Sequence, residues 1–188
     1  MGCREIEKVG FVMTEKSTNK FSYVVKEWII PILTALILAW LINTFLVFRI
    51  EVPTGSMIPT INKNDKIFVM KSYDKDNFER GDILVFNSEE LDNMLLIKRL
   101  IGLPGDHVEL ISGQLYINDE MVEEPYVLNN SDFSATFDVP EDHLLFMGDN
   151  RETSNDARYW AQPYISKEEV IGKGGFRIFP LNNIGFLK

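Results

Sequence analysis

Two residue types that often reveal the chemistry of a chain are nearly absent here. The 188 residues contain one cysteine, Cys3, and two histidines, His107 and His143. Because Cys3 lies close to the start of the sequence, the remainder of the chain can form no internal disulfide. No His, Cys and Asp residues have the spacing of metal ligands, and no glycine-rich phosphate loop precedes a helix. The sequence therefore predicts neither a metal site nor any other cofactor.

Positive charge is also in short supply. Lys and Arg number 19 against 28 Asp and Glu, which gives a formal net charge of −9. The negative excess lies after residue 27, and a nucleic-acid partner would need a basic face there. We therefore expect no nucleic-acid partner and interpret the acidic surface as a determinant of solubility. No feature of the sequence indicates an oligomeric state.

Charged residues disappear altogether between residues 28 and 48, where 21 residues include no Asp, Glu, Lys, Arg or His. As a helix this run would be roughly 31 Å long, which matches the hydrocarbon core of a bilayer. A cleaved signal peptide has a shorter apolar core and a small-residue cleavage site, whereas Arg49-Ile50-Glu51 follows here. A core helix this long and wholly apolar does not suit so small a domain. The run predicts a transmembrane helix over 28–48.

The lysines near this run favour one orientation. Lys16, Lys20 and Lys26 precede it, and cytoplasmic flanks are enriched in Lys and Arg. We predict a short cytoplasmic tail over 1–27, a single span over 28–48 and an extracytoplasmic domain over 49–188. The expected location is the plasma membrane, with the lipid bilayer as a partner of the chain.

Beyond the span the sequence has the pattern of a β domain. Short β-branched and aromatic runs are separated by turn residues, and helical periodicity is scarce. The expected strands are 66–70, 82–86, 94–101, 108–111, 114–117, 143–147 and 175–179. The fold class is therefore mainly β, with folded sheets or a barrel-like arrangement. Residues 106–141 are predicted to form a β-ribbon insertion.

A serine and a lysine are candidates for nucleophilic catalysis. Ser56 lies in the run VPTGSMIPT (52–60), and a serine becomes nucleophilic only when a base takes its proton. Neither histidine has a local sequence that marks it as that base, so both are interpreted as surface or turn residues. Lys98 follows the apolar residues 94–97, and a lysine can act as the base where burial lowers its pKa. Taken alone, this segment favours a Lys98 that faces solvent over a buried one.

Four segments considered together resemble the bacterial type I signal peptidase family of membrane-anchored serine proteases. Residues 52–60 resemble its nucleophile segment, 81–86 a structural β segment and 97–106 its general-base segment. The run GDNRETSNDAR (148–158) resembles its last signature. The four occur in the family's order after an apolar anchor, and the short ribbon is similar to that of the compact Gram-positive-type members.

This resemblance implies a role for individual residues. Ser56 would be the nucleophile and Lys98 the general base, with Ser154 orienting the Lys98 amine. The backbone N–H of Ser56 and the hydroxyl of Thr54 would bind the oxyanion. Many family members have serine at the position of Thr54, and threonine keeps the hydroxyl while restricting its rotamer.

The resemblance also implies a charged scaffold and an apolar substrate pocket. The residues expected to form ion pairs near the site are Arg99, Asp149, Asp156 and Arg158. Ala157 stands where serine is common, and we place it outside the proton path. The family removes signal peptides from exported preproteins after small residues, in an Ala-x-Ala pattern. The residues expected to line the pocket are Ile50, Val52, Pro53, Met57, Leu96 and Ile97.

Two other functions are compatible with parts of this pattern. One is a Ser/Lys protease of the self-cleaving repressor type, although such proteins are soluble and carry a DNA-binding or partner segment. The other is an inactive β module, tethered to the membrane, that binds secreted chains. Retention of Ser56, Lys98 and Ser154 together favours the enzyme.

Overall fold

The computed structural model describes residues 17–88 and 94–187. The chain divides into two compact units, one ending at Asn43 and the other beginning at Thr44. The first described elements are helical and follow one another without a break. They are α1 (Ser17–Val24), η1 (Val25–Ile29), α2 (Ile30–Leu41) and η2 (Ile42–Leu46), of which η1 and η2 are π-helical.

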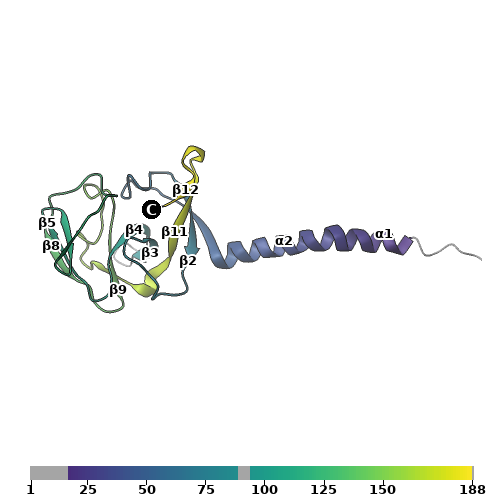
Figure 1. Ribbon diagram of the computed structural model, residues 1–188, viewed down its shortest axis with the longest axis horizontal. Helices are drawn as coiled ribbons and strands as arrows, with labels where there is room; N and C mark the ends of the chain where they lie inside the picture. Colours follow the sequence, from purple (N-terminus) through teal and green to yellow (C-terminus); the bar gives the residue numbers. More distant parts are fainter. Residues whose placement is uncertain (1–16, 89–93, 188) are drawn as a thin grey trace, which may run out of the picture. The chain divides into compact units, whose positions relative to one another are not determined.

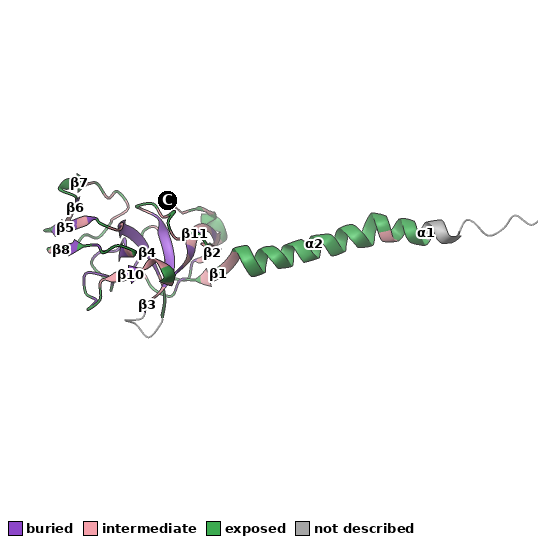
Figure 2. Cartoon of the chain, turned by 90° about the horizontal axis from the view of Figure 1, so that it is seen from below, coloured by how far each residue is buried: buried purple, intermediate pink, exposed green. Residues whose placement is uncertain are grey.

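The segment Phe21–Leu46 is long and apolar enough to cross a membrane. Its 26 residues include a window of mean hydropathy 2.2, and the side chains of that window are not buried by the protein (Figure 2). Such a surface is unfavourable in water and suits a lipid environment. The helical segment starts before the predicted span of 28–48 and ends at Leu46. Val47 and Phe48 instead belong to a strand, where they pair with Met70 and Val69.

The second unit is built around a large antiparallel sheet (Figure 1). Its strand order is β1-β2-β11-β3-β4-β9-β10, and β12 pairs with β11. The strands are β1 (Val47–Glu51), β2 (Lys66–Lys71), β3 (Ile83–Ser88), β4 (Met94–Gly102), β9 (His143–Met147), β10 (Tyr164–Ser166), β11 (Val170–Phe179) and β12 (Gly185–Phe186). Two short 3₁₀ turns, η4 (Lys167–Glu169) and η5 (Leu181–Asn183), flank β11. The mainly β prediction is confirmed.

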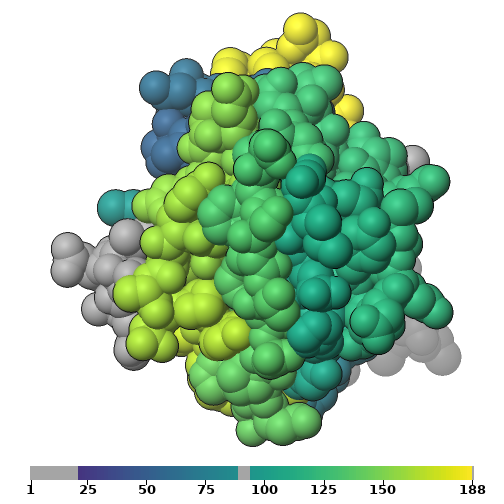
Figure 3. All heavy atoms as spheres, turned by 90° about the vertical axis from the view of Figure 1, so that its left-hand side faces the viewer, coloured from purple at the N-terminus to yellow at the C-terminus, as the bar shows by residue number. Residues whose placement is uncertain are grey.

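A second, smaller sheet occupies the region of the predicted ribbon. It has the order β7-β6-β5-β8, with β5 (His107–Ile111), β6 (Gln114–Ile117), β7 (Glu120–Val122) and β8 (Ala135–Asp138). Both residues of each tight turn, 112–113 and 118–119, have positive φ, as the twist of a two-residue hairpin requires. In the space-filling view this sheet, in teal and green, forms one end of the unit beside the yellow-green chain around β10 (Figure 3).

The core of the second unit consists of two apolar clusters. The larger one joins β3, β4 and β9 to the smaller sheet, with Phe86 stacked on Phe146 at a centroid distance of 4.3 Å. The smaller one packs β2 and β3 against the chain that follows β1. β4 passes between these clusters, so its residues from Ile97 to Gly102 are all buried. Lys98 therefore lies in a stretch of β4 that is almost wholly removed from water.

Candidate active site

Ser56 lies in the loop between β1 and β2. The loop leaves β1 through Val52, whose backbone N–H and carbonyl bond to Asp65 and Asn64 at 2.9 and 2.7 Å. A turn closed by the Ile58 N–H on the Gly55 carbonyl, at 3.2 Å, holds Ser56 between them. The Ser56 hydroxyl is 3.3 Å from the Thr54 hydroxyl. Ser56 is 8% exposed, so its side chain is reachable without being freely solvated.

Lys98, on β4, is the buried cation of the site. It is 3% exposed, and its Nζ donates a hydrogen bond of 2.9 Å to Ser154 Oγ. Burial lowers the pKa of Lys98 from 10.5 to about 8, against the opposing attraction of Asp156. Roughly a tenth of the amine is then neutral at pH 7, some 300-fold more than for an ordinary lysine. The alternative left open by the sequence, a solvent-facing lysine, does not hold.

Ser154 is carried by the loop that follows β9. Gly148 opens this loop where it meets the Ser56 turn, and a Cβ there would lie 2.5 Å from the Ser56 carbonyl oxygen and closer still to Ser154 Oγ. The backbone N–H of Asn150 donates to that same carbonyl at 3.0 Å. The lack of a side chain at Gly148 thus brings the nucleophile turn and the Ser154 loop together.

Two buried ion pairs hold this loop in place. Asp149 accepts two hydrogen bonds from the Arg99 guanidinium at 2.8 and 2.7 Å. Asp156 accepts from Arg158 Nε and from the Gly148 N–H, both at 2.8 Å. Burial alone would raise the pKa of Asp156, but these donors bring it below its ordinary value. The structure thus brings the four charged residues expected near the site into two close pairs.

A third buried ion pair escaped the sequence analysis. Arg151 makes hydrogen bonds of 2.5 and 2.8 Å to Glu124, which follows β7. The Tyr126 hydroxyl donates to Glu124 at 2.7 Å, and the Tyr126 ring centroid lies 3.9 Å from the Arg99 guanidinium carbon. Because Glu124 is far from residues 148–158 in sequence, no local pattern could have shown that it partners Arg151.

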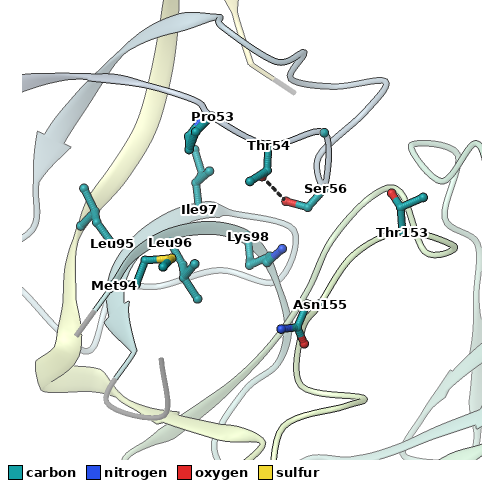
Figure 4. Close-up of a pocket in the computed structure, with 11 residues that line it drawn as sticks. Pro53, Thr54, Ser56, Met94, Leu95, Leu96, Ile97, Lys98, Thr153 and Asn155 are labelled. Carbon is teal, nitrogen blue, oxygen red and sulfur yellow. Dashed lines mark hydrogen bonds between the residues drawn. The ribbon is translucent and has the colours of Figure 1, made fainter. Parts of the chain in front are cut away.

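A cavity of about 380 Å³ opens beside Ser56 and Lys98 (Figure 4). Of the expected pocket residues, Pro53, Leu96 and Ile97 line it. Val52 and Met57 are 1% and 0% exposed within the smaller core cluster, against which Ile50 also packs. The cavity is lined in addition by Thr54, Gly55, Met94, Leu95, Thr153 and Asn155.

The two histidines lie elsewhere. His107 starts β5 and its ring bonds to Asp138 at 2.6 Å, while His143 starts β9 and bonds to the Glu141 carbonyl at 2.9 Å. Neither lines the cavity. Within the described ranges, no three His, Cys, Asp or Glu residues cluster as metal ligands would. Of these two histidines and Lys98, Lys98 alone lines the cavity that Ser56 also lines.

Comparison with known proteins gives a consistent assignment. Residues 25–179 match the family described as signal peptidase, peptidase S26. The chain is 39% identical to a signal peptidase I from Bacillus licheniformis over 183 residues, 90% of this chain and 96% of the relative. It is 38% identical to a signal peptidase I P from Bacillus subtilis subsp. natto, over 94% of this chain and the whole relative.

Among solved structures, a signal peptidase I from Enterococcus faecalis aligns with a TM-score of 0.46. Its sequence identity is 32%, over 52% of this chain and 96% of that one. The family match covers most of the chain, including every strand of both sheets except β12 and every site residue named above. The chain belongs to the signal peptidase I family, serine endopeptidases that remove signal peptides.

Proposed function

We propose that the chain is a membrane-anchored endopeptidase that removes signal peptides with a Ser56–Lys98 dyad. The observation that carries the proposal is the state of Lys98: buried, with a pKa lowered to about 8, and lining the same cavity as Ser56 (Figure 4). A lysine of this kind can accept a proton near neutral pH, as in the known Ser–Lys variants of the catalytic triad.

The first chemical step is attack on the scissile carbonyl. The neutral Lys98 amine takes the proton of Ser56 as Oγ bonds to the carbonyl carbon. The resulting ammonium then donates a proton to the leaving amine as the peptide bond breaks. Water, deprotonated by the same amine, attacks the acyl carbon; as the signal peptide leaves, the Lys98 ammonium returns the proton to Ser56 Oγ. Ser154, 2.9 Å from Lys98 Nζ, would keep the amine oriented through both steps.

The oxyanion would be bound by the Ser56 backbone N–H and the Thr54 hydroxyl. Among the described residues, none accepts a hydrogen bond from that N–H, so it is available to a substrate. Thr54 is within 3.3 Å of Ser56 Oγ, close to where the oxyanion would form. Removal of one such donor typically lowers kcat by about 10²- to 10³-fold.

Specificity for small residues would come from the apolar part of the cavity. Pro53, Leu96 and Ile97 would form a shallow apolar wall. This wall would contact the alanine just before the scissile bond and a second alanine two residues earlier in the substrate. A substrate lying extended along β4 would present alternate side chains to the same wall, which explains an Ala-x-Ala pattern. The proposed substrates are thus exported preproteins with Ala-x-Ala sites.

The apolar segment Phe21–Leu46 would anchor this site at the membrane surface where preproteins emerge. Because Cys3 is the chain's sole cysteine, an impermeant thiol reagent can test the orientation. We expect Cys3 to be labelled only after cells are permeabilised, and Ser112→Cys, in a Cys3→Ser background, to be labelled directly. The opposite pattern would place the catalytic domain in the cytoplasm.

The activity itself is tested by cleavage of a purified preprotein by the detergent-solubilised full chain. Ser56→Ala should abolish cleavage at the Ala-x-Ala site while Ser134→Ala, outside the cavity, retains it. Equal cleavage by wild type and Ser56→Ala would move the nucleophile elsewhere. Binding of preproteins without cleavage by the folded wild type would support a binding module instead.

A further inference from the structure

Two polar side chains of the cavity wall take no part in the proposed chemistry. Thr153 and Asn155 precede and follow Ser154, and both are exposed whereas Ser154 is buried. Within residues 17–88 and 94–187, the Thr153 hydroxyl and the Asn155 amide make no hydrogen bond to the protein. Hydroxyl and amide groups can both donate and accept, so this part of the wall is equipped to bind a polar ligand.

The cavity has an apolar end on β4 and a polar end at Thr153 and Asn155, and both ends adjoin the reacting groups. The apolar end follows β4 from Ile97 back to Met94. At the rise of a strand, Met94 lies roughly 13 Å along β4 from Lys98. The polar end flanks Ser154, whose Oγ is bonded to Lys98 Nζ. In Figure 4 the apolar side chains lie to the left of Ser56 and Lys98, Thr153 lies to the right of them, and Asn155 lies below them.

We infer that Thr153 and Asn155 bind the first residues of the mature protein, those that directly follow the scissile bond. The inference rests on the proposed function and adds a second specificity site to it. An extended substrate leaves Ser56 in two opposite directions. If its small apolar residues before the bond fill the apolar end, the residues after the bond cross the polar end.

The chemistry of the polar end fits that segment. Every substrate has a main chain with N–H and C=O groups, so hydrogen bonds to it can hold this segment whatever its side chains are. The Asn155 amide can donate to a substrate carbonyl and accept from a substrate N–H. A hydrogen bond on the leaving segment would hold the scissile amide in place while Lys98 protonates its nitrogen.

Charge substitution at Asn155 tests the assignment with the full-length enzyme in detergent. Three forms of one preprotein would differ only in the two residues after the Ala-x-Ala site, which are neutral, acidic or basic. Cleavage by wild type, Asn155→Asp and Asn155→Lys is compared as kcat/KM. Glu152→Gln is the matched control, because Glu152 is an exposed residue of the same loop that does not line the cavity. It changes the charge by the same amount as Asn155→Lys.

We expect Asn155→Asp to shift the preference toward the basic form by roughly fivefold relative to wild type, the effect of an exposed ion pair. Asn155→Lys should shift it toward the acidic form, and Glu152→Gln should keep the wild-type ratio. If the ratio of kcat/KM between the basic and acidic forms is the same in all four enzymes, the inference is wrong while the proposed function stands. A charge preference that depends on the residues before the scissile bond would have the same consequence. If the folded wild type cuts no form at all, the proposed function fails as well.

Discussion

Lys98 and Arg99 are neighbours on β4, equally buried at 3% exposure, and their surroundings are opposite. Arg99 faces a carboxylate, with two hydrogen bonds to Asp149 and an aromatic ring against its guanidinium. The one protein group that Lys98 Nζ bonds to is the neutral hydroxyl of Ser154, in the part of the chain that the structure describes. The fold thus stabilises charge where it needs a scaffold and disfavours charge where it needs a base.

Replacing Lys98 should have the largest effect on activity and the opposite effect on stability. Loss of one member of a catalytic triad lowers kcat by about 10⁴- to 10⁶-fold, and we expect an effect of that order for Lys98→Met. A lysine whose pKa is lowered by burial is held at a cost when charged, so Lys98→Met should be at least as stable as wild type below pH 8. Preprotein cleavage and chemical unfolding of the variant measure the two effects.

Lys63→Met is the matched control, since Lys63 is exposed on the loop after the Ser56 turn. It should keep near wild-type cleavage. Near wild-type cleavage by Lys98→Met would show that Lys98 is not the base.

Replacing Arg99 should reverse this pattern. Arg99→Met leaves the carboxylate of Asp149 buried without its charged partner, which typically costs about 3–5 kcal/mol of unfolding free energy. Arg49→Met, at an exposed position of β1, should cost much less. Denaturant unfolding of the full chain in detergent compares the two.

The double variant Arg99→Met/Asp149→Leu removes both charges and should recover part of the lost stability. It keeps the comparison testable if the single variant does not fold. A single variant as stable as wild type would contradict the scaffold role of this ion pair.

Glu124 extends the comparison to a smaller effect. Glu124→Gln keeps the shape of the side chain but removes the charge facing Arg151, and charged hydrogen bonds are worth about 1.5–3 kcal/mol. Because Arg151 Nε also bonds to the Gly148 carbonyl at 3.0 Å, we expect the Ser154 loop to loosen and kcat to fall more than KM rises. The pH profile of kcat, measured beside the unfolding free energy, separates this effect from a general loss of stability, which would lower the amount of active enzyme without changing that profile.

The same contrast explains what the sequence could predict. Short β-branched and aromatic runs separated by turn residues predicted seven strands, which correspond to β2, β3, β4, β5, β6, β9 and part of β11, because strand patterning is a local property. Four motifs in order pointed to the family that the comparisons confirm. Lys98 could not be placed from its neighbours alone, because its burial depends on two core clusters from distant strands.

Contacts between side chains that are distant in the sequence could not be predicted either. Glu124 meets Arg151 only after the smaller sheet has folded beside the loop, and Val52 and Met57 point into the core rather than into the cavity lining. The sequence gives no sign that Thr153 and Asn155 line the cavity. Their exposure on either side of the buried Ser154 is visible only in the structure.

The central claim is that Lys98 is a base with a pKa near 8. The most direct test is the pH dependence of kcat/KM for preprotein cleavage, which reports the ionisation of groups in the free enzyme. Deprotonation of Lys98 creates the active form, so we expect the rate to rise with pH and level off above a midpoint of about 8. A midpoint near 6.5, the ordinary pKa of histidine, or a rate that still rises at pH 10, would contradict the account.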